Sequence, residues 1–190
     1  DDLYSLTLER LDALQLYQTI STKFPEISFN IYSSERWYVE QEDEWVKQEA
    51  AITKMDPESI SMEYFLKEHL PVHKILCMGN PDDIQKLEDE LARANLSNIS
   101  YYRSKDTYME IVNNQVSKLG ALHFLCEKYG VELANTLAIG DNFNDMPMII
   151  HAGKGIAMGN APDEVKQAAD CVTDTNDENG FYKALAMSLG

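Results

Sequence analysis

The spacing of apolar positions switches repeatedly between helical and strand periods along the first half of the chain. Apolar residues three or four apart predict helices, whereas alternating or short apolar runs predict strands. The predicted helices cover 5–24, 43–55 and 62–70, with a fourth beginning at residue 81, and the predicted strands cover 27–32, 37–39, 74–78, 99–102 and 108–112. This order of elements is an α+β pattern rather than a doubly wound one.

The sequence predicts which residues are buried for two of these helices. The helix at 81 is the best marked, because Asn80 is a good N-cap, Pro81 suits the first helical position, and Asp82 favours the positive end of the helix dipole. Its expected buried face comprises Ile84, Leu87 and Leu91. The expected buried face of helix 5–24 comprises Leu8, Leu11, Leu14 (or Ala13) and Tyr17.

After Ser117 the pattern becomes a regular alternation of helices with short apolar strands. The predicted helices cover 118–129, 144–151, 162–169 and 181–189, and the predicted strands cover 136–139, 155–158 and 171–173. Short strands separated by helices indicate a parallel sheet with crossover connections, the arrangement of α/β proteins. The chain is therefore expected to form two domains, an α+β domain over 1–110 and an α/β domain over 111–190.

Charge narrows the range of partners. The chain has 16 Lys and Arg against 32 Asp and Glu, a net charge of −16, which disfavours contact with the phosphates of nucleic acids. No apolar run approaches the roughly 20 residues that span a bilayer, so we expect no membrane segment. Cys77, Cys126 and Cys171 form no Cys-x-x-Cys pair, which is typical of reduced thiols in a cytoplasmic protein.

The strongest candidate for chemistry is the polar loop that follows strand 136–139. Gly140 ends the strand, and Asp141, Asn144 and Asp145 follow within five residues. Ligands of open parallel sheets bind at the carboxyl ends of the strands, and two carboxylates there suit Mg²⁺. The alternative is structural: strand–helix turns often use such acids as loop and N-cap residues.

A second candidate is Lys118, which opens a predicted helix after the polar run 113–115. A lysine in the first turn lies at the unfavourable end of the helix dipole. That position is tolerable on a surface, and it is better explained if the ammonium points at a phosphate.

Three other features carry less weight. The glycine-rich run 153–161 matches neither of two nucleotide-binding motifs, the Gly-x-Gly-x-x-Gly pattern and the Walker loop. It is interpreted as tight turns around a short strand. His69 and His73 do not have the spacing of a zinc helix, and Pro71 separates them. The acids at 40–44 are expected to form a solvated helix start. The aromatic residues Trp37, Tyr38, Trp45, Tyr101 and Tyr102 either pack the first sheet or line a substrate face.

Together, several runs of the second half resemble the haloacid dehalogenase-like (HAD) hydrolases, and specifically their Cof-type phosphatase branch. The runs are Ser117-Lys118, Ala138-Ile-Gly-Asp-Asn-Phe-Asn-Asp145-Met146, Gly155-Ile-Ala-Met-Gly-Asn-Ala161, Ala168-Ala-Asp170 and Asn176-Asp177-Glu178. The match covers roughly 108–190, and residues 1–107 resemble the branch's cap only in element order. The resemblance implies an α/β fold in which residues 111–190 form the C-terminal part of a Rossmann-like parallel-sheet core and residues 1–110 an α+β cap that selects the substrate.

The resemblance also implies a role for each candidate residue. Lys118 would steady the phosphoryl group and the nucleophile, Asp141 would bind Mg²⁺, and Asn144 would contact the phosphate. Asp145 would support the loop and the metal shell. Leu119 departs from the Gly that many relatives carry after the lysine, which a helix tolerates well. The implied substrate is a small phosphorylated metabolite such as a sugar phosphate.

One family element is missing from these 190 residues. The nucleophile of the family is the first Asp of an Asp-x-Asp-Gly-Thr motif, and no Asp-Gly pair occurs here. We therefore expect a fragment, a cap plus the C-terminal half of the core, that is inactive alone. Strand 136–139 would then be an exposed sheet edge that self-associates or holds an N-terminal segment. The rivals are a non-catalytic binding or assembly module, and a phosphomutase or sucrose-phosphatase-like relative.

Overall fold

The computed structural model describes the chain except residues 1–2, 69, 95 and 190, and it divides the chain into two compact units. Unit 1 is Asp1–Val116 and unit 2 is Ser117–Gly190. The expected boundary near 110 is therefore six residues too early. It falls inside a strand that continues to Asn113 and is paired along its length with its neighbours, so the chain leaves unit 1 only after that strand ends.

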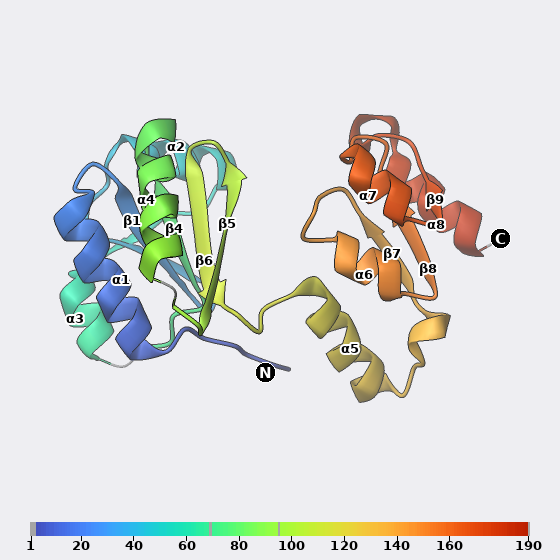
Figure 1. Ribbon diagram of the computed structural model, residues 1–190, viewed down its shortest axis with the longest axis horizontal. Coiled ribbons are helices and arrows are strands. Elements are labelled where there is room, and N and C mark those ends of the chain that lie inside the picture. The colour runs from blue at the N-terminus through green and yellow to red at the C-terminus, as the bar shows by residue number, and fades with distance from the viewer. Residues whose placement is uncertain (1–2, 69, 95, 190) are drawn as a thin grey trace. The chain divides into compact units, whose positions relative to one another are not determined.

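Unit 1 is a mixed sheet with helices on both faces (Figure 1). Its strand order is β3-β2-β1-β4-β6-β5, with every neighbouring pair antiparallel except the parallel pair β2–β3. The elements are α1 (Arg10–Lys23), β1 (Ser28–Ser33), β2 (Arg36–Val39), α2 (Glu44–Thr53), β3 (Glu58–Ser59), α3 (Met62–Lys67), β4 (Lys74–Met78), α4 (Pro81–Ala94), β5 (Ile99–Lys105) and β6 (Tyr108–Asn113). The α+β pattern is confirmed.

Two hydrophobic clusters lie on the two faces of this sheet. The larger joins α1, α3 and α4 to one face and includes Leu16, Phe65 and Leu87. The smaller joins α2 to the other face through Trp37 and Val46. Both faces are covered at least in part, so alternate residues of the central strands are buried on opposite sides.

The predicted buried face of the first helix is partly wrong. Leu8 and Ala13 are buried as predicted, whereas Leu11 is 74% exposed, and α1 also buries Leu16 and Ile20. The helix begins at Arg10 rather than residue 5, so Leu8 lies in the segment before it and cannot define the helical face on which Leu11 was placed. The fourth helix is confirmed as predicted, with Ile84, Leu87 and Leu91 buried.

Unit 2 is a three-stranded parallel sheet, in the order β7-β8-β9, with helices between the strands (Figure 1). The elements are α5 (Lys118–Tyr129), β7 (Leu137–Gly140), α6 (Met146–His151), β8 (Lys154–Ala157), α7 (Asp163–Ala168), β9 (Cys171–Val172) and α8 (Gly180–Leu189), with short 3-10 helices at Leu133–Asn135 and Asn176–Glu178. The α/β class predicted for this part of the chain is confirmed.

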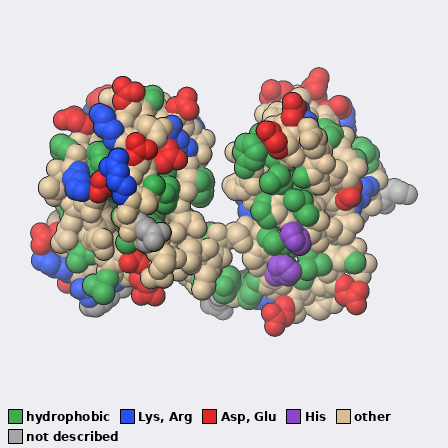
Figure 2. All heavy atoms as spheres, viewed as in Figure 1, with side chains coloured by type: hydrophobic (Ala, Val, Ile, Leu, Met, Phe, Trp, Pro, Cys, Tyr) green, Lys and Arg blue, Asp and Glu red, His purple; other side chains and the backbone are tan. Residues whose placement is uncertain are grey.

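Unit 2 buries little and exposes much apolar surface. Its main cluster comprises Ile149, Ala157, Ala161 and Val165. Its exposed large apolar side chains include Leu125, Tyr129, Phe143, Ile150 and Phe181. Figure 2 shows hydrophobic side chains gathered at the surface of this unit. Within the described residues β7 pairs only with β8, so its other side is an open edge, as the sequence predicted.

None of the helices in the described part of the chain has the length and apolar character needed to cross a bilayer.

Candidate active site

The polar loop predicted to carry chemistry leaves the carboxyl end of β7. The strand ends at Gly140, the loop continues from Asp141 to Asp145, and α6 begins at Met146. Because β7 and β8 are parallel, the loop lies at the edge of the sheet where α/β proteins bind their ligands.

Asp145 organises this loop from a buried position. The residue is 1% exposed, and its side-chain Oδ2 atom accepts backbone N–H bonds from Asp141 at 2.9 Å and from Asn142 at 3.1 Å. Asp145 occupies the N-cap position of α6, yet its side chain makes no capping bond to that helix. The carboxylate instead turns back into the loop, so of the structural alternative the helix-capping part is not seen for Asp145, whereas its part as a loop acid is.

Gly140 makes room for this carboxylate. A Cβ atom built on Gly140 would lie 2.3 Å from the Cβ of Asp145 and 2.6 Å from its Cγ, far inside contact distance. A side chain at residue 140 would therefore push Asp145 away from the two amides that it accepts. The glycine at the end of the strand is a requirement of the loop.

Lys118 comes to the same carboxylate from another helix. Ser117 caps α5 by accepting the backbone N–H of Gly120 at 2.9 Å, which fixes Lys118 as the first helical residue. The Lys118 ammonium donates to Oδ1 of Asp145. The lysine side chain remains 50% exposed in this ion pair, whereas the Asp145 side chain is 2% exposed. The two candidates, 27 residues apart in sequence, are thus joined.

Asp141 presents its carboxylate at the surface beside this pair. The residue is exposed, and its Oδ2 atom accepts a hydrogen bond from Nδ2 of Asn160 at 3.0 Å. Asn144 is also exposed on the loop, so it is open to solvent rather than part of the ion pair. Three of the four candidates, Lys118, Asp141 and Asp145, therefore form one connected group.

The arrangement suits an anion and a hard cation. The half-exposed ammonium of Lys118 can donate to an external oxyanion, and the exposed carboxylate of Asp141 is a ligand type that Mg²⁺ prefers. Both oxygens of Asp145 already accept protein donors. Within the described residues no three His, Cys, Asp or Glu side chains converge as a metal cage. These residues fit a magnesium ion that takes one protein carboxylate here and keeps several of its waters, as Mg²⁺ usually does.

Sequence reasoning missed Asn160 as part of the site. It lies in the run Gly159-Asn160-Ala161, which contributed to the family resemblance but received no role. Its position after β8, the strand next to β7, was the available signal, because the carboxyl ends of neighbouring parallel strands meet at one edge.

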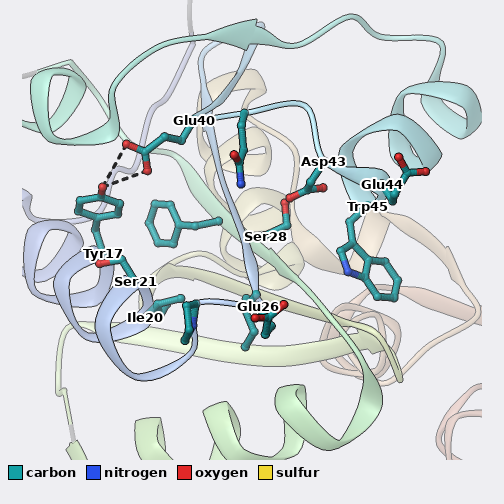
Figure 3. Close-up of a pocket in the computed structure, with 13 residues that line it drawn as sticks. Tyr17, Ile20, Ser21, Glu26, Ser28, Glu40, Asp43, Glu44 and Trp45 are labelled. Atoms are coloured by element: carbon teal, nitrogen blue, oxygen red, sulfur yellow. Dashed lines mark hydrogen bonds between the residues drawn. The ribbon is translucent and has the colours of Figure 1, made fainter.

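Unit 1 contains a pocket that several acidic side chains line. It measures about 520 Å³ and is lined by Tyr17, Ile20, Ser21, Pro25, Glu26, Ile27, Ser28, Phe29, Glu40, Gln41, Asp43, Glu44 and Trp45 (Figure 3). The Tyr17 hydroxyl donates to Glu40 at 3.0 Å, and burial together with this bond raises the pKa of Tyr17. Asp43 caps α2 by accepting from Val46 at 2.9 Å.

Among the acids at 40–44 that were predicted as a solvated helix start, Asp43 caps α2. Glu40, Asp43 and Glu44 line this pocket. Among the aromatic residues, Trp37 is buried and packs the sheet, whereas Trp45 reaches the pocket. Both ring nitrogens of His73 are used within unit 1. Nδ1 accepts the backbone N–H of Ser34 at 2.9 Å, so Nε2 carries the ring proton and donates to the Ser5 hydroxyl oxygen at 2.8 Å. His69, the other histidine considered, lies outside the described residues.

Comparison with known proteins identifies the class. The family model for haloacid dehalogenase-like hydrolases matches residues 1–185, so the chain belongs to this family. It is 34% identical over 186 residues to a putative phosphatase of Haemophilus influenzae, covering 97% of this chain and 69% of that protein. It is 40% identical over 121 residues to the 5-amino-6-(5-phospho-D-ribitylamino)uracil phosphatase YcsE of Bacillus subtilis, covering 62% of this chain and 48% of YcsE.

The fold agrees with this assignment. A haloacid dehalogenase-like hydrolase from Bacteroides thetaiotaomicron superposes with a TM-score of 0.87 at 34% identity, over 98% of this chain and 69% of that structure. The resemblance to the Cof-type phosphatases of the family is confirmed. The chain spans about half to two thirds of the length of these proteins.

Proposed function

We propose that these residues belong to a Mg²⁺-dependent phosphatase that hydrolyses a small phosphorylated metabolite, such as a sugar phosphate, through an aspartyl-phosphate intermediate. The observation that supports this most is the buried Asp145 carboxylate, which joins Lys118 to the Asp141 loop. The buried Asp145 holds Lys118 next to the exposed Asp141. Such an arrangement can position a phosphate at the lysine and a cation at the exposed acid.

The proposed reaction has two displacements. A carboxylate oxygen from outside these 190 residues attacks phosphorus and forms a P–O bond while the P–O bond to the metabolite breaks. The leaving oxygen takes up a proton from solvent water and departs as the alcohol. Water then attacks the phosphorus of the aspartyl phosphate, which releases inorganic phosphate and restores the carboxylate.

Each residue of this chain has a part in that scheme. Lys118 donates to the phosphoryl oxygens, Asn144 binds the phosphate from the exposed loop, and Asp141 supplies one carboxylate to magnesium. Asp145 holds the loop and Lys118 in place. A bound Mg²⁺ would neutralise charge on the phosphoryl oxygens as it develops.

The substrate is the least constrained part of the proposal. YcsE acts on a phosphorylated ribityl compound by its name, and this similarity supports a phosphorylated sugar or sugar alcohol. Unit 1 is proposed as the cap that selects it. The proposed compartment is the cytoplasm, which the three free cysteines Cys77, Cys126 and Cys171 support.

The test compares two proteins with p-nitrophenyl phosphate and Mg²⁺. The 190-residue chain is expected to show no turnover above blank, because no candidate nucleophile motif occurs in it. The chain extended by the residues encoded before Asp1 is expected to be active if they carry Asp-x-Asp-Gly-Thr. Turnover by the 190 residues alone would contradict the assignment of the nucleophile. Absence of turnover by an extended protein with that motif would favour the rival, a binding or assembly module.

A further inference from the structure

Asn160 connects the exposed acid of the site to a second loop. Its Nδ2 donates to Oδ2 of Asp141 at 3.0 Å, and its Oδ1 accepts the backbone N–H of Asn176 at 3.0 Å. An amide that accepts on one side and donates on the other has only one orientation that satisfies both bonds. The backbone of residue 176 thus determines which end of the Asn160 amide faces Asp141.

The turn that carries Asn160 is fixed on two sides. The Met158 N–H donates to the carbonyl of Gly140 at 2.8 Å, at the end of β7, and the Gly159 N–H donates to the carbonyl of Asp174 at 3.0 Å. A Cβ on Gly159 would lie 2.8 Å from the backbone nitrogen of Thr175, so only glycine allows this contact. The backbone that carries Asn160 is therefore held on both sides, and the side-chain amide bonds Asp141 and Asn176 from this fixed base.

This geometry has a consequence for Asp141. An exposed aspartate samples several rotamers, and a metal that binds it must immobilise it at an entropic cost. With Oδ2 held by Asn160, the carboxylate is already oriented before a metal binds. Groups that hydrogen-bond a metal ligand commonly set its orientation and its affinity.

We propose that Asn160 is a positioning residue for divalent-cation binding at Asp141, and that the backbone N–H of Asn176 sets its orientation. The inference rests on the metal role proposed for Asp141 and goes beyond it, because it assigns the preorganisation of that carboxylate to a turn and a loop outside the 141–145 segment.

The test measures metal binding directly, with Mn²⁺ as a paramagnetic stand-in for Mg²⁺. Mn²⁺ is titrated into the ¹⁵N-labelled 190-residue chain, and line broadening of the Asn142 and Phe143 amides reports occupancy at the loop. Asn160→Ala is expected to raise the Mn²⁺ concentration for half-broadening about tenfold, the usual range for a group behind a metal ligand. Asp141→Asn should abolish the local broadening.

Two variants at residue 176 separate backbone from side chain. Asn176→Ala keeps the N–H and should bind as the unmodified chain does. Asn176→Pro removes the N–H and should weaken binding as Asn160→Ala does. Proline suits the first position of a short helix, and the preceding Thr175 already has an extended backbone, φ −69° and ψ 164°. Amide shifts far from the loop confirm that each variant is folded.

The outcomes distinguish the two levels of the argument. If Asp141→Asn binds Mn²⁺ at the loop as the unmodified chain does, the metal role of Asp141 is wrong and this inference falls with it. If Asp141→Asn loses binding while Asn160→Ala retains it, the metal role stands and the positioning role is overturned. Weakening by Asn176→Ala to the same degree as by Asn176→Pro would overturn the assignment to the backbone N–H.

Discussion

Removing the Asp145 carboxylate should destabilise unit 2 far more than any exposed acid of that unit would. In Asp145→Ala the backbone N–H groups of Asp141 and Asn142 lose their shared acceptor, and Lys118 loses its partner. In Asp145→Asn a carbonyl oxygen at the Oδ2 position can still accept both N–H groups, while the amide nitrogen faces the ammonium of Lys118.

The contacts set the size of these effects. A hydrogen bond to a charged group contributes about 1.5–3 kcal/mol, so losing two predicts a loss of roughly 3–6 kcal/mol for Asp145→Ala. The ion pair adds little, since Lys118 is half exposed and such pairs are worth about 0–1 kcal/mol. Asp145→Asn keeps both acceptor contacts without the charge and should lose about 1–2 kcal/mol.

The assay uses the positions of the tryptophans. Both, Trp37 and Trp45, lie in unit 1, so tryptophan fluorescence follows the unfolding of that unit, whereas far-ultraviolet circular dichroism follows both units. In urea, the unfolding of unit 2 is the part of the circular dichroism transition that fluorescence does not follow. Asp145→Ala should lower the urea midpoint of that part and leave the midpoint of the fluorescence transition unchanged. Asp163→Ala, an 88% exposed acid side chain of unit 2, is the matched control and should change stability by less than about 0.5 kcal/mol.

The result that would refute this reasoning is a stable Asp145→Ala variant. If its unit 2 transition coincides with that of Asp163→Ala, the two backbone bonds do not support the loop as described. If Asp145→Asn is as destabilised as Asp145→Ala, the ion pair rather than the acceptor geometry dominates, and the ranking of contacts given above is wrong.

Three further predictions follow from other contacts. Gly140→Ala should destabilise unit 2 about as much as Asp145→Ala in the same urea assay, because the added methyl displaces Asp145, and an unchanged midpoint would contradict the close approach. The pKa of Tyr32 is raised from 10.0 to about 12, first by burial and then by the charges of Glu49 and Glu110. The contribution of Tyr32 to stability is therefore full below about pH 10 and is lost as pH rises toward 12. Tyr32→Phe should raise the pH midpoint of alkaline unfolding, followed by tryptophan fluorescence, whereas Tyr64→Phe at an exposed tyrosine should not. The open edge of β7 should lead the chain to self-associate or to retain a bound segment, and sedimentation velocity showing a clean 21.6 kDa monomer without a second peptide would exclude both.

The elements that the sequence predicted well carry their own local signals. The helix Pro81–Ala94 has a first-turn proline, early acids and a regular apolar face, and all of these act within one element. The same holds for the start of α5, where the Ser117 cap defines the first turn. Strand Glu58–Ser59 was missed because its two exposed residues have no pattern of their own and form a strand only by pairing with β2.

The candidate site was predictable as residue types but not as an arrangement. The spacing of Gly140, Asp141 and Asp145 showed that carboxylates gather after a strand. It could not show that one acid is buried and the other exposed, because this division depends on which backbone amides turn toward Asp145. The link from Asp141 to Asn160 was hidden for the same reason, since it joins two loops that only the parallel pairing of β7 and β8 brings together.

The two acids of the loop are suited to different tasks because they are solvated differently. A buried carboxylate with three donors is satisfied by the protein, so it has little to gain from a metal ion and much to lose from moving. An exposed carboxylate with one donor keeps a free oxygen at little desolvation cost. Under the proposed function this difference places the cation at Asp141 and keeps Lys118, paired yet half exposed, free to donate to a phosphoryl oxygen without leaving Asp145. The charged groups of the site would then be oriented before the substrate binds. They would need little rearrangement when negative charge develops on the transferring phosphoryl group.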